Sequence, residues 1–243
     1  MTRRLSFGIT FLATDPPDAF IEMAKYIDHS GFDFLWVADA SLYGRYVYSY
    51  LTLCALYTKR VRFGPNCAHP LTRHPAVNFN AMTTIDEMSH GRAIMNVGAG
   101  GGTVKELGYA GAKMKSIREM IEQGRALMTG EPVHHDSETM MLKGASLRFL
   151  SRHDLPIYMT ASGPKMLEMA GELCDGVIFM PGTAPACIDA SNAGSACPWR
   201  TPTWSGSPST PTIRRCCSST TPMTPTPPMR RARRSSRRGR APA

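Results

Sequence analysis

The sequence of 243 residues lacks features that define several classes of protein. Its seven cysteines form no Cys-x-x-Cys pair and no zinc-site spacing, so we predict no metal centre and no disulfide framework. No stretch approaches the roughly 18 apolar residues that a membrane-spanning helix needs, and no secretory signal follows Met1. We therefore expect a cytoplasmic protein with reduced cysteines and no membrane contact.

Lysine and acidic residues are absent from residues 193–243, which contain ten arginines. Because the net charge is +9, the first 192 residues sum to −1, and the basic character belongs to this segment alone. The segment has nine prolines and sixteen serines and threonines, but one isoleucine and no leucine, valine, phenylalanine or tyrosine. Such a composition buries too little apolar surface to offset its ordering entropy. We therefore predict a disordered Arg/Pro/Ser/Thr-rich tail over 191–243.

Two interpretations of this tail compete. Its last residues, RRARRSSRRGRAPA, could form a basic arm that binds nucleic acid or an anionic surface. Alternatively, the tail is a GC-rich gene translated in the wrong frame, which would favour arginine over lysine and enrich proline, alanine, serine and threonine. We favour the frame error, because no aromatic residue is interleaved with these arginines and because a regular pattern stops where the tail begins.

Residues 1–190 do carry a regular pattern, in which apolar strands alternate with amphipathic helices. Strands are expected at 5–13, 32–39, 61–68, 93–97, 155–161 and 176–180, and helices at 16–30, 47–59, 75–90, 113–128 and 164–173. In the helix 75–90, Ala81, Met82, Ile85 and Met88 recur at the spacing of one inward face. Residues 131–149 are polar and predict an inserted hairpin.

The strands are apolar throughout rather than alternating, which is typical of a parallel sheet covered by helices. The α/β architecture is then either a doubly wound open sheet or a TIM (β/α)8 barrel. Six strand–helix units are present, so a barrel would be incomplete by two.

Two loops lie at the carboxyl ends of predicted strands. The cluster Gly98–Gly102 lacks the third glycine of a dinucleotide fingerprint, because Thr103 stands there, and no helix is expected to start at once. It predicts a loop that allows close backbone approach to a ligand. In TASGPKM, residues 160–166, small residues precede a helix that begins with Pro164, so free N–H groups can face an anion.

Charged residues also follow these strands. Asp39 ends the second strand, where its carboxylate could serve as acid or base, accept a hydrogen bond, or cap the next segment. Arg73 and His74 follow the third strand, and for His74 we expect a capping role. His134, His135 and Asp136 could bind a metal, but in a polar insertion we interpret them as solvated.

Three stretches together carry a family resemblance: FDFLWVAD, PLTRHPAVNFNAMTTIDEMSHGRAIMNVGAG and ASGPKMLEMAGELCDGVI. With them the chain resembles the luciferase-like (bacterial luciferase superfamily) flavin- and F420-dependent oxidoreductases, and most of all their methylenetetrahydromethanopterin reductase branch. The resemblance implies an eight-stranded barrel that binds coenzyme F420 or FMN at the carboxyl ends of its strands. It also implies a small-molecule substrate and a homo-oligomer.

The resemblance assigns roles to particular residues. Asp39 would face the ring system and is the candidate catalytic residue. Asn66 and Cys67 would form a bulge with a non-prolyl cis peptide bond behind the ring. The other cofactor-binding candidates are Ala99 and Gly100, which would touch the cofactor, and Ala161, Ser162 and Gly163, which would hold its phosphate. Ala40 and Gly101 stand where relatives often carry a histidine and a glutamate, so no proton-transfer residue follows from the resemblance.

We predict that residues 1–190 form an incomplete barrel whose parent transfers a hydride between F420, or FMN, and a small organic substrate. Two alternatives stay open. The chain could be an FMNH2-dependent monooxygenase of the same family, because reduced FMN reacts with oxygen whereas the deazaflavin does not. It could also be an inactive truncated product, or a nucleic-acid-binding protein that acts through its tail.

The frame hypothesis is testable on the coding DNA. Translation of the other two frames downstream of residue 190 is expected to yield two further strand–helix units. If neither frame encodes them, the basic-arm interpretation is the one to keep.

Overall fold

The computed structural model describes residues 6–149, 152–179 and 214–215. The predicted tail, 191–243, and the hypotheses about it lie outside the described residues, except for Arg214 and Arg215. The strands are β1 (Gly8–Phe11), β2 (Phe34–Ala38), β3 (Arg62–Asn66), β4 (Met95–Val97), β5 (Val133–Asp136), β6 (Met141–Ala145), β7 (Ile157–Ala161), β8 (Gly176–Phe179) and β9 (Arg214–Arg215).

The helices begin and end close to the predicted positions. They are α1 (Pro17–His29), α2 (Val47–Tyr57), α3 (Pro75–Met88), α4 (Gly102–Glu106), α5 (Met114–Leu127) and α6 (Pro164–Leu173). Three of them start at proline, whose fixed φ suits a first turn and whose missing N–H would have no partner there.

Two predictions about the helices are wrong. The short helix α4 begins directly after the glycine cluster, where no helix was expected to start; its five residues, GTVKE, are too few to show an apolar period. Met88 was assigned to the inward face of α3 but is exposed. It lies in the last turn of α3, and the chain turns away at Ser89.

Six parallel strands adjoin in chain order. One sheet has the order β1-β2-β3, and a second has the order β4-β7-β8, with β9 antiparallel to β8. Parallel bridges from Phe63 to Ala93 and from Ala68 to Val97 join β3 to β4. A doubly wound sheet reverses its strand order at a switch point, and the described strands show no such reversal.

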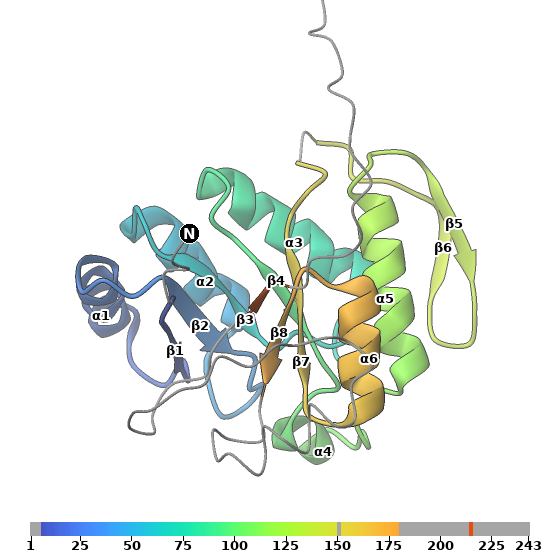
Figure 1. Ribbon diagram of the computed structural model, residues 1–243, viewed down its shortest axis with the longest axis horizontal. Coiled ribbons are helices and arrows are strands. Elements are labelled where there is room, and N and C mark those ends of the chain that lie inside the picture. The colour runs from blue at the N-terminus through green and yellow to red at the C-terminus, as the bar shows by residue number, and fades with distance from the viewer. Residues whose placement is uncertain (1–5, 150–151, 180–213, 216–243) are drawn as a thin grey trace, which may run out of the picture.

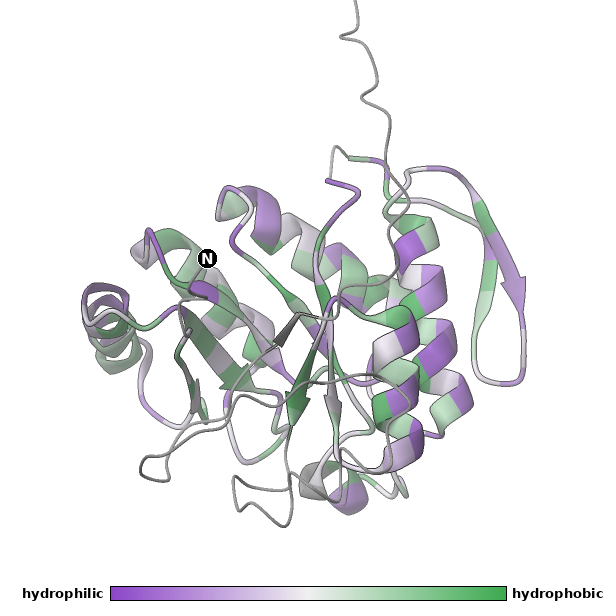
Figure 2. Ribbon diagram, in the orientation of Figure 1, coloured by the Kyte–Doolittle hydropathy of each residue, from purple (hydrophilic) through white to green (hydrophobic). Residues whose placement is uncertain are grey.

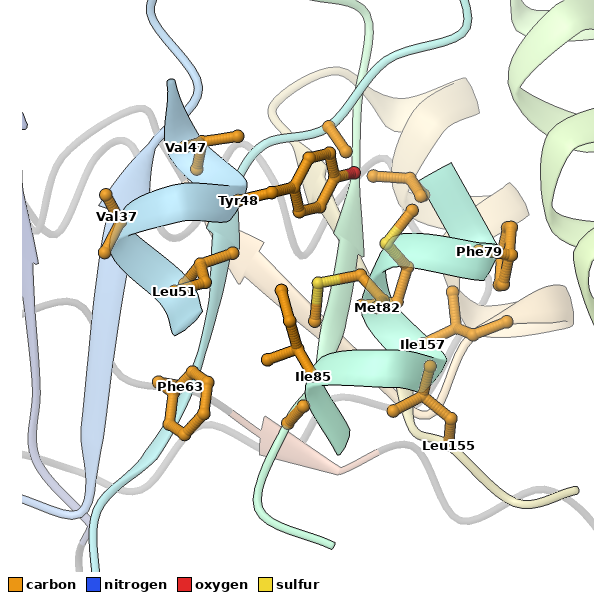
Figure 3. Packing of buried hydrophobic residues seen from close by; sticks show 14 of the residues in the cluster. Val37, Val47, Tyr48, Leu51, Phe63, Phe79, Met82, Ile85, Leu155 and Ile157 are labelled. Atoms are coloured by element: carbon orange, nitrogen blue, oxygen red, sulfur yellow. The ribbon is translucent and has the colours of Figure 1, made fainter. Parts of the chain in front are cut away.

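The helices cover one face of these strands. α1, α2, α3, α5 and α6 each contact the next in that order, and they lie side by side around the strands (Figure 1). α5 shows both hydrophobic and hydrophilic residues along its length (Figure 2), and its buried residues are Ile117, Glu119, Met120, Ile121, Gly124 and Leu127. Met82 and Ile85 of α3 lie on the side of Leu51 and Phe63, whereas Phe79 lies on the other side of α3 (Figure 3), where its ring packs against Gly124 of α5. This layer is the main core.

The opposite face of the strands carries its own buried cluster. Its members are Phe34, Trp36, Ile94, Tyr158 and Ile178. The rings of Trp36 and Tyr158 lie 6.0 Å apart although they come from different sheets. On β3 this face needs a glycine, because a Cβ on Gly64 would lie 2.1 Å from the carbonyl oxygen of Ile94. Strands β2, β3, β4, β7 and β8 are therefore buried on both faces, as their continuous apolar runs predict, whereas Thr10 of β1 is exposed.

Residues 131–149 form the predicted hairpin, in which β5 and β6 pair antiparallel. The hairpin is attached to α5 through Glu119, which accepts hydrogen bonds from the hydroxyls of Ser137 and Thr139. His134 and His135 lie in β5, and no group of metal-binding side chains occurs among the residues that the structure describes. In the same part of the chain, no helix combines the length and apolar character that crossing a bilayer requires.

Aspartates bind the amino ends of four strands. Asp33 accepts a hydrogen bond from the N–H of Phe7, Asp86 from that of Ala93, and Asp175 from that of Ile157. Asp28, at the end of α1, accepts from three successive N–H groups, Lys59, Arg60 and Val61, at 2.7–2.9 Å. Burial pushes the pKa of Asp28 upward, but these three hydrogen bonds outweigh burial and lower the pKa below its usual value of 3.8.

Replacement of this carboxylate by Asp28→Asn is expected to lower the free energy of unfolding by about 2 kcal/mol at pH 7, since charge-assisted hydrogen bonds are lost. A carboxylate whose folded-state pKa is lowered stabilises the protein above its unfolded-state pKa and loses this effect as the pH falls. Urea titrations should therefore show the difference between variant and wild type shrinking below about pH 4. The exposed Asp18→Asn is the control, with a change of at most about 0.5 kcal/mol; a pH-independent loss in Asp28→Asn would contradict the assignment.

Candidate active site

The carboxyl ends of the parallel strands meet at the end of the molecule where α4 lies (Figure 1). The predicted site residues belong to the loops at this end. Asn66 is the last residue of β3, and the peptide bond between Asn66 and Cys67 is cis, at the position that the family resemblance implies. The backbone N–H of Asp39 donates to the carbonyl of Asn66 at 3.2 Å, which places the end of β2 beside this bond.

A layer of polar side chains lies directly beneath these loops. The amide Nδ2 of Asn96, on β4, donates to the Asn66 Oδ1 atom at 3.2 Å, to Thr160 Oγ1 at 3.0 Å and to the Pro65 carbonyl at 3.1 Å. Asn66 Nδ2 reaches Thr10 Oγ1 on β1 at 3.4 Å. Asn96 is fully buried. Strands β1, β3, β4 and β7 are thus tied together by one side-chain network at the floor of the candidate site.

Cys67 stands at the edge of this polar layer. A Cβ on Gly98 would lie only 2.4 Å from Cys67 Sγ, so glycine at 98 is what lets the loops after β3 and β4 close on each other. Burial raises the pKa of the Cys67 thiol, although hydrogen bonds involving the Gly100 backbone and the Thr160 hydroxyl act in the opposite direction. The group is therefore a neutral thiol, suited to contact with an uncharged ring.

The loop after β4 holds Ala99 and Gly100. The Ala99 carbonyl accepts from the N–H of Ala112 at 2.7 Å, which fixes the loop against the segment before α5. Gly100 has φ +83°, a conformation that favours glycine. A Cβ at Gly100 would meet Val104 at 3.1 Å and the ring of His69 at 3.5 Å. Gly98 therefore lies against Cys67, and Gly100 lies against Val104 and His69.

Asp39 is held by a cation. Its Oδ2 atom forms an ion pair with Arg73 Nη2, and the two side chains are 3% and 11% exposed. Arg73 also donates from Nε to Asn78 Oδ1 at 2.9 Å, and Tyr48 donates to the same oxygen at 2.7 Å. The guanidinium stacks over the rings of Tyr46 and Tyr48 at 5.4 and 5.0 Å. The carboxylate is therefore fixed in place, with one oxygen engaged by Arg73.

An open cleft of about 370 Å³ lies beside this ion pair. Its walls come from the segment after β2, the segment after β3 and Leu107, which follows α4. The lining residues are Asp39, Ser41, Leu42, Gly44, Arg45, Tyr46, Val47, Thr72, Arg73 and Leu107. Of the pair Tyr46 and Tyr48, only Tyr46 lines the cleft, because Tyr48 is buried in the core. His74 lies outside the cleft lining and has the capping role that we expected, as its Nδ1 accepts from the Ala76 N–H.

Ala161, Ser162 and Gly163 join β7 to α6. The side chain of Ala161 is buried in the core between the strands and the helices, so only its backbone can take part in binding. Ser162 and Gly163 are exposed. Gly163 is the N-cap of α6, and no described atom lies within 4 Å of where its Cβ would be. The first turn of α6 is therefore open to an approaching anion.

Sequence reasoning missed the polar floor. Asn96 and Thr160 lie within apolar runs that read as strand interiors, and both sit on the face opposite the helices. The alternation along Ile94, Asn96 and Gly98 is the signal that could have identified this face, but the short strand β4 shows it over few residues. The pairing of Arg73 with Asp39 could not be predicted from the sequence either, because 34 positions separate the two residues and no local pattern links them.

These features define a class: an α/β protein with parallel strands in chain order and a backbone-lined site at their carboxyl ends. The sequence pattern of the luciferase-like monooxygenases matches residues 5–191. The chain belongs to that family, and the predicted resemblance is confirmed.

The relatives include F420-dependent enzymes. The chain is similar to the 5,10-methylenetetrahydromethanopterin reductase of Archaeoglobus fulgidus, at 39% identity over 180 residues, 72% of this chain and 53% of that protein. It is similar to the F420-dependent glucose-6-phosphate dehydrogenase of Amycolatopsis mediterranei, at 29% identity, 68% of this chain and 54% of that protein. The structure of the coenzyme F420 dependent tetrahydromethanopterin reductase from Methanopyrus kandleri matches with TM-score 0.71 at 28% identity, over 79% of this chain and 60% of that one. The chain spans about half the length of the curated relatives that it matches.

The ion pair at the cleft yields a stability prediction. Arg73→Met leaves the buried Asp39 carboxylate without its cation and is expected to lower the free energy of unfolding by about 3 kcal/mol. Arg73→Lys keeps the charge but not the fork of donors, so its loss should be smaller. In urea unfolding, the double variant Asp39→Asn/Arg73→Met should lose less than the sum of its single variants. Full additivity would show that the two side chains act independently.

Proposed function

We propose that residues 5–191 bind coenzyme F420 across the carboxyl ends of β3, β4 and β7, and that the parent protein transfers a hydride between F420 and a small organic substrate. The observation that carries the proposal is the convergence of the Cys67, Gly98–Gly100 and Ser162–Gly163 loops at one end of the strands, above a polar floor. The F420-dependent names of the relatives support the choice of cofactor.

The residues at this end fit such a group. Glycine at 98 lets the Cys67 thiol pack against the backbone of the loop after β4, and glycine at 100 lets this loop lie close to Val104 and His69. The loops after β3 and β4 therefore form one compact surface, on which we propose that the planar ring lies. The N-terminus of α6 presents the positive end of the helix to an anionic tail, with the N–H groups of Gly163 and Lys165 as the donors, since Pro164 has no N–H and those of Met166 and Leu167 donate to the Gly163 carbonyl. Asn66, Cys67, Ala99 and Gly100 would contact the ring, and Ala161, Ser162 and Gly163 would hold the phosphate.

When bound, the deazaflavin supplies a hydride carrier that is restricted to two-electron transfer. The protein's part is to orient the ring and to exclude water on the side of the neutral Cys67 thiol. Asp39 is fixed by Arg73 in the wall of the cleft, so its carboxylate would face the cofactor ring on the side where the substrate binds. We propose the cleft beside this pair as the place of the substrate.

We also propose that residues 1–190 form an incomplete TIM (β/α)8 barrel, of which β1, β2, β3, β4, β7 and β8 are six of the eight strands. The sequential order of the strands supports this, and so does the aromatic cluster around Trp36, which occupies the face that would become the barrel interior. FMN in place of F420, with monooxygenation as the chemistry, is the second candidate, because the family is named for monooxygenases.

Binding titrations of the full chain with F420 and with FMN test the proposal. Saturable binding of F420 is expected, whereas preference for FMN would shift the assignment to the monooxygenase candidate. Failure to bind either cofactor would contradict the site itself.

A matched pair of variants at Gly163 tests the phosphate position. Gly163→Asp places a carboxylate beside the proposed phosphate and should weaken F420 binding about tenfold by repulsion. Asp and Ser are both favourable N-caps and no described atom obstructs a side chain there, so neither variant should lose stability. Gly163→Ser is the neutral control and should bind within about threefold of wild type; equal weakening by both would point to steric interference instead of charge.

A further inference from the structure

His69 is a buried histidine that the proposed mechanism does not use. It lies in the segment between β3 and α3 and is 1% exposed. Its Nδ1 atom accepts a hydrogen bond from the N–H of Leu71 at 3.4 Å, and its backbone carbonyl accepts from Asn78 Nδ2 at 3.2 Å. Burial lowers the pKa of His69, so the ring is neutral at pH 7. In a neutral ring whose Nδ1 accepts, the proton is on Nε2.

This Nε2–H donor has no hydrogen-bond partner among the described residues. Buried polar groups are paired in the great majority of cases, because an unpaired donor forfeits its hydration without replacement. The hydroxyl of Thr72, three residues further along the same segment, is a second buried polar atom without a partner in the described part of the chain. Thr72 lines the cleft beside Asp39 and Arg73.

The position of the ring connects His69 to the candidate site. Its Cδ2 atom, which is bonded to Nε2, would lie 3.5 Å from a Cβ at Gly100. The ring carbon next to the unpaired donor therefore lies against the loop after β4. On the proposed function, this loop touches the cofactor ring. The segment 69–72 thus brings two unpaired polar atoms between the Gly100 loop and the cleft.

We propose that His69 is a binding residue of this site, whose Nε2–H donates a hydrogen bond to a carbonyl oxygen or ring nitrogen of the bound heterocycle. The proposal rests on the proposed function, because it takes the bound heterocycle as the missing acceptor. The chemistry requires a neutral acceptor atom on a planar ring, which deazaflavin and flavin both offer. His69 orients the ring and carries no proton in the reaction.

Two amide variants separate this role from a structural one. His69→Asn places its amide near Nδ1, so it can keep the bond from the Leu71 N–H but loses the distal donor. His69→Gln reaches the position of Nε2 and restores a donor there. F420 and FMN are titrated separately against the full chain and both variants, and the melting temperature of each protein is measured without ligand.

We expect the Asn variant to bind the preferred cofactor about tenfold more weakly, the value of one hydrogen bond, and the Gln variant to bind within about threefold of wild type. Equal binding by wild type and Asn variant overturns the proposal. Weakening of both variants in proportion to their loss of melting temperature also overturns it, since the role is then structural. A wild-type chain that binds neither cofactor rejects the proposed function itself and is recognised before any variant is compared.

A measurement on the unmutated chain does not depend on the folding of the variants. With ¹⁵N-labelled histidine, one Nε2–H resonance is expected to shift and to exchange more slowly with water when cofactor saturates the site. If all seven histidines keep their resonances at saturation, His69 has gained no partner and the proposal fails.

Discussion

One side chain, that of Asn96, completes the join between β3 and β4. The backbone ladder between these strands is present on both sides of the join, from Phe63 to Ala93 and from Ala68 to Val97, but not between. There β3 contains Pro65, which has no N–H to donate to β4. Asn96 fills the interruption, because its amide donates to the Pro65 carbonyl and to Asn66. A buried amide thus replaces a strand hydrogen bond, and it holds the two sheets together.

The same interruption lies beside the candidate site. Beyond it the two segments are hydrogen-bonded again, because the Ala68 N–H donates to the Asn96 carbonyl and the Gly98 N–H donates to the Ala68 carbonyl, and Cys67 packs against Gly98. Thr160 continues the side-chain network to β7. The polar floor thus pairs backbone and side-chain groups at the join, and it lies directly beneath the loops proposed to hold a cofactor.

The repeating part of the fold could be predicted from the sequence, and the reason is local. Periodicity, proline at helix starts and glycine at helix ends act over a few residues, so they placed α1, α3 and α6 within a residue or two. The helix α4 has only five residues, too few for an apolar period that would predict a helix. The exposure of Met88 depends on where the chain leaves α3, which the period does not give. The pairing of Asp39 with Arg73 and the isolation of His69 Nε2 depend on distant segments meeting, which no local pattern encodes. The family resemblance predicted which loops meet, but not which side chains within them are satisfied.

The two ends of the strands differ in how completely their polar groups are paired. At the amino ends, Asp28 binds three backbone N–H groups, and Arg92 donates to five oxygens of the neighbouring loops and helix ends. At the carboxyl ends, His69 Nε2 and Thr72 Oγ1 are buried with no partner in the described residues. In barrels of parallel strands, residues at the amino end stabilise the fold and residues at the carboxyl end carry function. The same division appears here only in part: Nη2 of Arg152, beside Asp86 at the amino ends, also lacks a partner among the described residues, whereas the two unpaired atoms at the carboxyl ends lie beside the candidate site.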